Sequence, residues 1–177
     1  MASVETEART ECTLVLGGVR SGKSRHAEQL VMAAPAPWIY IATARVWDEE
    51  MQARIERHRE DRAVGWQTVE EPLGLAGALE EAGQAPVLVD CLTLWLTNLL
   101  LAERDIASET GAVLRVLARR SAPTVLVSNE VGLGIVPETP LGRRFRDEAG
   151  WLNQAVACAA RRVVFMVAGL PMIVKAG

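Results

Sequence analysis

The residues of this chain with the clearest chemical potential form one short segment near its start. Residues 17–24 read Gly17, Gly18, Val19, Arg20, Ser21, Gly22, Lys23 and Ser24, which matches the phosphate-binding pattern Gly-x4-Gly-Lys-Ser/Thr. The glycines of such a loop let backbone N–H groups point at a bound phosphate. Lys23 is expected to reach the β- and γ-phosphates of a nucleoside triphosphate, and the Ser24 hydroxyl to bind Mg²⁺.

The segments on either side of this loop have the patterns that such a site requires. An apolar run at 13–16 predicts a strand before it, and residues 26–33 predict a helix after it. A helix that starts at the loop adds partial positive charge where the phosphate binds. The alternative is a Gly/Ser turn that ends in a surface lysine. The agreement between the motif and its surroundings favours the phosphate loop.

A second acidic residue stands at the end of an apolar run. Val87, Leu88 and Val89 precede Asp90, the form of a strand whose terminal carboxylate lies near the Mg²⁺ of a phosphate-loop protein. Asp90 can instead cap the helix that follows it. Apolar runs that end in Asp are common, so the two interpretations are balanced until the phosphate loop is considered. Together with Ser24, Asp90 is predicted to be a magnesium ligand.

Strand and helix patterns alternate along the chain and predict the frame that positions these residues. Continuous apolar strands separated by helices indicate an α/β fold with a mostly parallel sheet and helices on both faces. Ligands bind beyond the carboxyl ends of the strands in such sheets. We expect one domain over residues 13–177, preceded by a polar tail at 1–12. Strands are predicted at 13–16, 38–42, 66–70, 86–90, 124–128, 163–167 and 172–175, and helices at 26–33, 48–61, 73–82, 92–103, 108–120 and 141–160.

Composition excludes several classes of protein. The 177 residues carry 19 basic and 22 acidic side chains, a net charge of -3, which argues against a general nucleic-acid or anionic-membrane binder. The apolar stretch at 87–102 is interrupted by four polar residues, so no membrane span is expected. The first eleven residues lack an apolar signal region, and we expect a cytoplasmic protein. Histidines and cysteines are too few at ligand spacing for structural zinc.

The cysteines and histidines are few enough to consider singly. Cys91 and Cys158 lie in apolar surroundings and are expected to be reduced core residues. His26 follows the phosphate loop and is interpreted as a surface or packing residue. His58 lies on the predicted helix 48–61 among arginines, where an isolated histidine is usually solvated or packed.

The order of the motifs along the chain resembles one family, and the resemblance runs from about residue 14 to 175. It is similar to the bifunctional adenosylcobinamide kinase/adenosylcobinamide-phosphate guanylyltransferases of cobalamin biosynthesis. The phosphate loop alone does not identify this family, but the ordered set of motifs is specific to it. The residues that carry the resemblance are 17–28, 40–44, 54–58, 66–72, 89–93, 128–138, 145–147 and 152–154.

The resemblance implies a RecA-like phosphate-loop (P-loop NTPase) fold, a homotrimer and two reactions. The first reaction phosphorylates the aminopropanol hydroxyl of adenosylcobinamide with a nucleoside triphosphate, either ATP or GTP. The second transfers GMP from GTP to adenosylcobinamide phosphate and releases pyrophosphate, with a GMP-histidine intermediate. His58 occupies the matching position in Arg-Ile-x-x-His. An imidazole nitrogen is a suitable nucleophile for the α-phosphorus.

The resemblance also implies a set of guanine-nucleotide contacts. Glu70 has a physical reason to be among them, because a carboxylate can accept hydrogen bonds from the N1–H and N2 groups of guanine, which adenine lacks. The alternative for Glu70 is a surface glutamate at a strand end. Arg59 and Arg62 would neutralise phosphate charge, although a solvated arginine face is the alternative. The implied contacts are Ala42, Thr43, Ala44, Arg59, Glu60, Asp61, Arg62, Glu70 and Asp90.

Some questions stay open from the residues alone. Val19 and the Arg161-Arg162 pair depart from the family pattern, but neither touches the chemistry-bearing positions. Asp90 and Glu130 are both candidates to activate the substrate hydroxyl. The apolar residues at 94–96 and 99–101 can belong to the core or to a subunit interface, and the core is the simpler interpretation. A phosphate-loop kinase of another metabolite would use Lys23, Ser24 and Asp90 but would give His58 no role. A nucleotide-dependent switch or motor subunit usually carries a basic stripe or a separate partner domain, and this acidic sequence shows neither.

Overall fold

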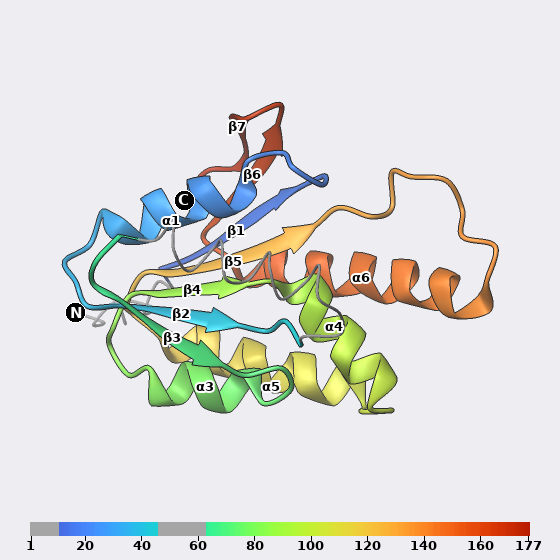
Figure 1. Cartoon of the computed structure of the whole chain (residues 1–177), viewed down its shortest axis with the longest axis horizontal. Coiled ribbons are helices and arrows are strands. Elements are labelled where there is room, and N and C mark those ends of the chain that lie inside the picture. The colour runs from blue at the N-terminus through green and yellow to red at the C-terminus, as the bar shows by residue number, and fades with distance from the viewer. Residues whose placement is uncertain (1–10, 46–62) are drawn as a thin grey trace, which may run out of the picture.

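The computed structural model describes residues 11–45 and 63–177. These residues form a single layered unit in which strands and helices follow one another along the chain (Figure 1). The elements are β1 Cys12–Gly17, α1 Lys23–Met32, β2 Trp38–Ala42, β3 Trp66–Glu70, α3 Leu75–Glu81, β4 Val87–Asp90, α4 Leu92–Leu101, α5 Ile106–Arg119, β5 Thr124–Asn129, α6 Pro140–Ala159, β6 Arg162–Val167 and β7 Leu170–Lys175.

The seven strands form one sheet in the order β3-β2-β4-β5-β1-β6-β7. Every neighbouring pair is parallel except β6 and β7, which are antiparallel. The predicted α/β class with a mostly parallel sheet is therefore confirmed. The strand that leads into the phosphate loop, β1, lies between β5 and β6, and only β5 separates it from β4, which ends at Asp90.

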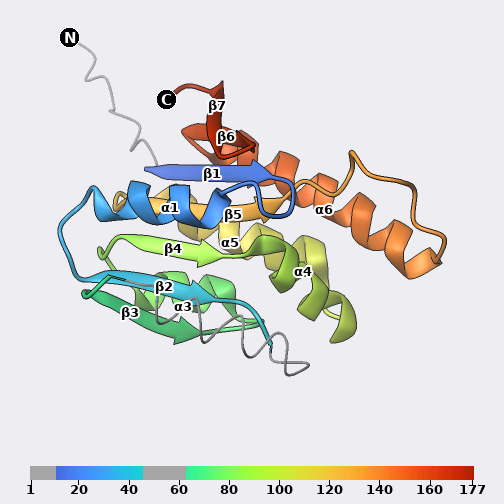
Figure 2. The same cartoon turned by 45° about the horizontal axis from the view of Figure 1, so that its top comes forward.

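Helices cover both faces of the sheet, as the sequence predicts. The helix α1 lies on one face, where Ala27 and Val31 pack with Val15 and Leu88, and α3, α4, α5 and α6 lie on the other (Figures 1 and 2). Successive strand residues alternate between the two layers, because side chains of a strand point to opposite faces. Both faces are thus apolar, which explains the continuous apolar strands.

The apolar residues of α4 belong mainly to the core. Trp95, Leu96 and Leu99 are fully buried, and the Trp95 indole N–H donates to the Leu73 carbonyl at 2.8 Å. Leu101, at the end of the helix, is exposed. The core interpretation is confirmed for the first three residues, and Leu101 departs from it.

Several element boundaries differ from those expected. The first helix begins at Lys23 and not at residue 26, because Gly22 adopts a left-handed conformation (φ 93°) and turns the chain directly into the helix. The strand β1 begins at Cys12, which the sequence placed in the tail. Glu11 also joins the fold, since its side chain forms an ion pair with Arg161. This contact gives one member of the unusual Arg161-Arg162 pair a structural partner.

The prediction for the cysteines is wrong at one position. Cys12 and Cys91 are buried, but Cys158 is exposed. Cys158 lies on α6, a 20-residue helix of which Ala149, Leu152, Asn153 and Val156 form the buried stripe. The apolar residues next to Cys158 in the sequence therefore do not show which side of the helix Cys158 lies on.

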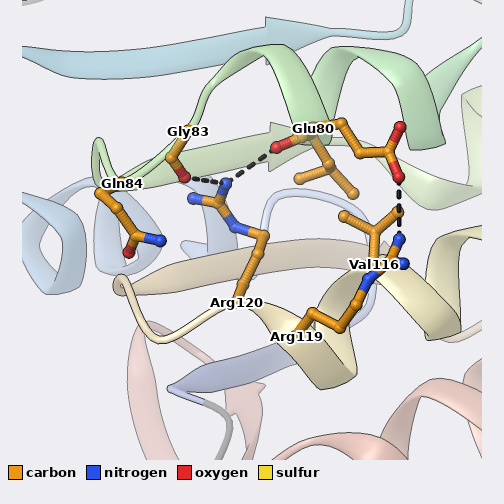
Figure 3. A pocket seen from close by; sticks show the side chains of 7 residues that line it. Glu80, Gly83, Gln84, Val116, Arg119 and Arg120 are labelled. Atoms are coloured by element: carbon orange, nitrogen blue, oxygen red, sulfur yellow. Dashed lines mark hydrogen bonds and ion pairs between the residues drawn. The ribbon is translucent and has the colours of Figure 1, made fainter.

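A buried arginine joins several elements at the edge opposite to the phosphate loop. The Arg120 guanidinium donates to the carbonyls of Leu79 and Gly83 at 2.8 and 2.7 Å (Figure 3). It also donates to the Ala85 carbonyl at 2.8 Å and to the Thr124 hydroxyl at 3.0 Å. Arg120 thereby satisfies carbonyls at the end of α3, which lack partners inside their own helix. The side chain lines a hollow of about 310 Å³ together with Arg119, which pairs with Glu80 at 2.9 Å.

The last strand is attached to the longest helix. The Lys175 ammonium group donates to the carbonyls of Ala157, Cys158 and Ala160 at 2.6–3.0 Å, at the end of α6. Apart from this lysine, β7 carries mostly exposed apolar side chains. Among the described residues, no helix has the length and apolar character to cross a membrane.

Candidate functional site

The phosphate loop connects the carboxyl end of β1 to the first turn of α1, as predicted. Gly17 has a φ of 152° and almost no room for a side chain, since a Cβ there would lie 2.7 Å from both the Met166 carbonyl and the Ser21 hydroxyl. Gly22 has a φ of 93° and precedes the helix directly. Glycine is the residue that adopts these conformations without strain. The loop is therefore shaped by backbone constraints at its two ends.

Neighbouring segments hold this loop from both sides. The Glu130 N–H, just after β5, donates to the Gly17 carbonyl at 3.1 Å, and the Gly169 N–H, in the turn between β6 and β7, donates to the Ser21 carbonyl at 3.1 Å. The Ser21 hydroxyl is buried and has no hydrogen-bond partner within the described structure. Val19 points outward and is exposed, so its departure from the family pattern does not alter the inner wall of the loop.

Lys23 is the buried cation of this loop. It is only 8% exposed, and its ammonium group donates to the Gly18 carbonyl at 2.6 Å. Burial lowers the pKa of Lys23 from its usual 10.5, and the nearby Cys91 and Asp90 side chains partly oppose this shift. Ser24 follows it in the first turn of α1 and is half-buried. An ammonium group held by a single loop carbonyl can exchange that bond for phosphate oxygens.

Asp90 lies on the same face of the sheet as α1, close enough to Lys23 to influence its pKa. It is half-buried at the end of β4, and its Oδ2 atom accepts a hydrogen bond from the Tyr40 hydroxyl at 2.9 Å. The structure thus places Lys23 and Asp90, which are 67 residues apart, at the same edge of the sheet. Tyr40 was not among the expected site residues.

The segment after β2 is held against the segment after β4. The Thr43 hydroxyl donates to the Cys91 carbonyl at 2.7 Å and accepts from the Cys91 N–H at 2.9 Å, and Thr43 is fully buried. The Asn98 amide donates to the Thr43 carbonyl at 2.7 Å. The Thr43 side chain therefore fixes Ala42 and Ala44 beside Asp90, and its hydroxyl is turned away from any ligand at the edge.

Glu70 ends β3, where it pairs in register with Ala42, and it is exposed. Its neighbour Glu71 has a structural task, because the Glu71 carboxylate accepts from the N–H groups of Leu73 and Gly74 at 2.9 and 2.7 Å. Glu70 lies on β3, and four strand-to-strand steps, about 19 Å, separate β3 from β1, the strand that leads into the phosphate loop. The described site residues hence form two groups on one edge, one around Lys23 and one at the ends of β2 and β3.

A polar network between these groups was not expected from the sequence. The Asn129 amide, at the end of β5, donates to the Thr93 hydroxyl at 2.7 Å, and the Asn153 amide donates to the Asn129 carbonyl at 3.3 Å. Ser128 and Asn153 each keep a buried oxygen without a partner in the described residues. Asn129 was placed at a strand end by its sequence, but the partners of Asn129 come from α4 and α6, so no local pattern shows them.

The other expected site residues lie outside the described part of the chain. These are the predicted nucleophile His58 and its neighbours Arg59, Glu60, Asp61 and Arg62. His26, the second histidine, is half-buried in α1, and burial together with the charge of Arg162 lowers its pKa below the usual 6.5. The expectation that His26 packs at the surface is consistent with this position.

Two curated bacterial proteins are similar to this chain over most of its length. The protein is 53% identical over 167 residues to the bifunctional adenosylcobalamin biosynthesis protein CobP of Pseudomonas aeruginosa, a match that covers 92% of this chain and 96% of the relative. It is 42% identical over 179 residues to CobU of Salmonella typhimurium, which has the same description, with 92% and 98% covered.

A solved structure supports the fold at greater distance. A protein of Pyrococcus horikoshii superposes with a TM-score of 0.55 at 13% identity, over 95% of this chain and 88% of the other. At the level of sequence, the model of the family described as cobinamide kinase/cobinamide phosphate guanyltransferase matches residues 13–174. The family prediction is confirmed: this chain belongs to the cobinamide kinase/cobinamide phosphate guanyltransferase family.

Proposed function

We propose that this chain phosphorylates the hydroxyl of adenosylcobinamide and then transfers GMP from GTP to the new phosphate, as a step of cobalamin biosynthesis. The observation that carries the proposal is a phosphate loop with a buried Lys23, on the edge of the sheet where β4 ends at Asp90, in a chain that belongs to this family. ATP or GTP serves as the phosphate donor of the first reaction, and GTP is the substrate of the second.

The residues at the loop fit a nucleoside triphosphate and Mg²⁺. Within residues 11–45 and 63–177, the buried Ser21 hydroxyl has no hydrogen-bond partner and the Lys23 ammonium group donates to one carbonyl, so phosphate oxygens would give both groups a partner. The Ser24 hydroxyl and the Asp90 carboxylate are oxygen donors of the kind that Mg²⁺ prefers. We assign Ser24 and Asp90 to the metal. Mg²⁺, when bound, supplies positive charge to the phosphate oxygens.

In the kinase step, the substrate hydroxyl oxygen forms a bond to the γ-phosphorus, and the bond from that phosphorus to the bridging oxygen breaks. Lys23 stabilises the charge that develops on the phosphates. The hydroxyl proton needs an acceptor, and we assign Glu130, since Asp90 is committed to the metal. Glu130 follows β5 beside the loop and uses its Oε1 atom to accept from the Gly132 N–H at 2.6 Å. Glu130→Gln should lose phosphorylation of cobinamide but keep the self-labelling reaction described below.

In the guanylyl transfer, a neutral nitrogen of His58 attacks the α-phosphorus of GTP. A phosphorus–nitrogen bond forms, the bond to the β-phosphate oxygen breaks, and pyrophosphate leaves. A phosphate oxygen of adenosylcobinamide phosphate then attacks the same phosphorus, and the electron pair returns to the imidazole. The Lys23 ammonium group stabilises the negative charge of the departing pyrophosphate.

We assign guanine selection to the second group of residues on the edge. Glu70 would accept from the N1–H and N2 groups of guanine, and Ala42, Thr43 and Ala44 would contact the nucleotide through their backbone. Arg59 and Arg62 would neutralise the phosphates of the nucleotide, and Glu60 and Asp61 between them belong to the same contact segment. The position of Glu70 beside Ala42 supports this assignment. Glu70→Gln should reduce the preference for GTP over ATP in self-labelling, and an unchanged preference would remove Glu70 from this role.

The two histidines of the chain allow a matched test of the proposed intermediate. The protein would be incubated with Mg²⁺ and GTP labelled at the α-phosphate, denatured and examined for retained label. We expect an acid-labile, alkali-stable adduct in the wild type and in His26→Ala, and none in His58→Ala. Absence of the adduct from a wild-type sample shown to bind GTP would favour a simple metabolite kinase, and label retained by His58→Ala would move the nucleophile elsewhere.

The oligomeric state and the location belong to the same proposal. We expect a homotrimer located in the cytoplasm. The segment that leads into α6 exposes apolar side chains suited to subunit contact, namely Leu133, Ile135, Val136 and Leu141. Sedimentation at several protein concentrations tests the trimer, and a monomer that persists at high concentration would contradict it.

A further inference from the structure

Tyr40 touches the carboxylate that we assign to Mg²⁺, although it lies in the middle of β2. Its hydroxyl donates to Asp90 Oδ2 at 2.9 Å, and the residue is only 4% exposed. The register explains the contact. Tyr40 pairs with Leu88 and Ala42 pairs with Asp90, so the tyrosine side chain runs along the α1 face of the sheet and spans the two residues that separate it from the strand end, about 7 Å.

The ring of Tyr40 is held in place by other aromatic residues. It meets Trp66 edge to face, with centroids 6.0 Å apart and planes at 81°. Trp66 in turn lies 5.5 Å from Trp38, whose indole N–H donates to the Ala34 carbonyl at 2.7 Å. This chain of contacts ties the Tyr40 hydroxyl to the end of α1. The hydroxyl therefore offers Asp90 a hydrogen bond from a fixed direction.

A fixed donor has a definite effect on a carboxylate that binds a metal. A hydrogen bond to Oδ2 sets the plane of the carboxylate and hence the direction of Oδ1, so the metal meets one orientation and not several. Mutation of a residue that hydrogen-bonds to a metal ligand commonly lowers metal affinity or activity by about 10–100-fold. Asp90 also lies near Lys23, and a free carboxylate would be drawn towards that ammonium group.

We propose that Tyr40 is a positioning residue that orients the Asp90 carboxylate towards the metal of the bound nucleotide. The inference rests on the proposed role of Asp90 as a magnesium ligand. It adds to the kinase site a residue that acts through its bond to Asp90.

The substitution Tyr40→Phe removes the hydroxyl and keeps the packed ring. With Mn²⁺ as a paramagnetic substitute for Mg²⁺, electron paramagnetic resonance measures metal binding to the protein–nucleotide complex without any turnover. We expect Tyr40→Phe to weaken Mn²⁺ binding about tenfold. In the kinase assay the loss should appear at low Mg²⁺ and be recovered in excess Mg²⁺, with little change in thermal unfolding.

A double-mutant cycle with Asp90→Asn separates positioning from a general structural effect. If Tyr40 acts through Asp90, then Asp90→Asn with Tyr40→Phe should bind Mn²⁺ no more weakly than Asp90→Asn alone. If Tyr40 only supports the fold, the two losses should multiply. A multiplied loss would overturn the proposal.

Tyr40 is the only tyrosine of the chain, which provides a direct spectroscopic readout. Protein grown with 3-fluorotyrosine should show one ¹⁹F resonance that shifts when Mg²⁺ joins the nucleotide complex. The shift should be lost in Asp90→Asn. A resonance that does not respond to Mg²⁺ in the wild type would count against the proposal.

The metal role of Asp90 and the positioning role of Tyr40 can be overturned separately. Mn²⁺ affinity unchanged in Asp90→Asn would overturn the metal role of Asp90 and so the proposed function at this residue. Weak binding in Asp90→Asn together with wild-type binding in Tyr40→Phe would overturn the role of Tyr40 alone.

Discussion

Lys23 and Arg120 are both buried cations, and they lie at opposite edges of the sheet. They are 8% and 6% exposed, and burial lowers the pKa of each from its usual value. Their partners differ. Arg120 donates to three carbonyls and a hydroxyl, whereas Lys23 donates to one carbonyl of its own loop. The comparison distinguishes a cation that the fold has satisfied from one that is kept ready for a ligand.

The largest effect that this comparison predicts is on catalysis at Lys23. Lys23→Met should lower kcat/KM for cobinamide phosphorylation about 10³-fold, because charge on the transferred phosphate loses its main side-chain donor. Stability should change little. Lys175→Met is the matched control, since Lys175 donates to three carbonyls at the end of α6, and this variant should remain active. Activity of Lys23→Met within tenfold of the wild type would contradict the view that Lys23 is kept ready for a ligand.

The second effect is on stability at Arg120. Arg120→Met should lower the free energy of unfolding by about 3 kcal/mol, because three carbonyls lose their donor in a mostly buried place. The folded fraction should keep its kcat. Arg119→Met, which removes an exposed ion pair with Glu80, should cost about 0.5 kcal/mol. Equal losses for the two arginines in urea unfolding would show that burial of Arg120 has no energetic weight.

The third effect is the pH dependence of stability at Lys23. The folded protein has a lowered Lys23 pKa, so between that value and 10.5 the unfolded chain binds more protons than the folded one. The contribution of Lys23 to stability therefore rises with pH in this window. At neutral pH, Lys23→Met should be at least as stable as the wild type, and this advantage should shrink as the pH approaches 10.5. A difference that grows with pH would contradict the sign of the shift.

The smallest effect is on the alkylation rates of two buried thiols, Cys12 and Cys91, which lie at opposite edges of the sheet. Burial raises the pKa of Cys12 to about 12 and that of Cys91 to about 11. Alkylation of these two thiols is measured in the Cys158→Ser variant, which lacks the exposed thiol. Both should be alkylated at least about a hundredfold more slowly than Cys158 is in the wild type. Nucleotide should slow alkylation of Cys91, beside Asp90, and leave Cys12 unchanged. Mass spectrometry of the alkylated peptides separates them. Equal protection of both thiols would indicate a global effect and no local site.

Local patterns were sufficient for the elements and for the phosphate loop. The predicted strands 38–42 and 66–70 have the same bounds as β2 and β3, because aromatic and β-branched residues are frequent in them and Pro37 and Gly65 precede them. Gly17 and Gly22 were placed correctly, since the turn leaves few other residues possible there. The prediction for Asp90 also held in position, as the end of β4.

Contacts between distant segments could not be predicted in this way. The bond from Tyr40 to Asp90 spans 50 positions and that from Thr43 to Cys91 spans 48, and both depend on β2 and β4 being neighbours. The adjacent residues Arg119 and Arg120 look alike in the sequence, yet one is exposed and the other is buried, because the helix ends between them. The prediction that Cys158 is a core residue was wrong for a related reason, since the face of α6 that is buried is set by tertiary packing.

The sheet order has a consequence for how the protein is made. Both neighbours of β1 in the sheet, β5 and β6, are translated after residue 123, and the turn that holds the Ser21 carbonyl is translated later still. The nucleotide-binding loop therefore leaves the ribosome well before the strands and the turn that hold it. A nascent chain stalled before β6 should fail to retain nucleotide, because the loop acquires its supporting contacts only after β6 and the turn that follows it have been synthesised.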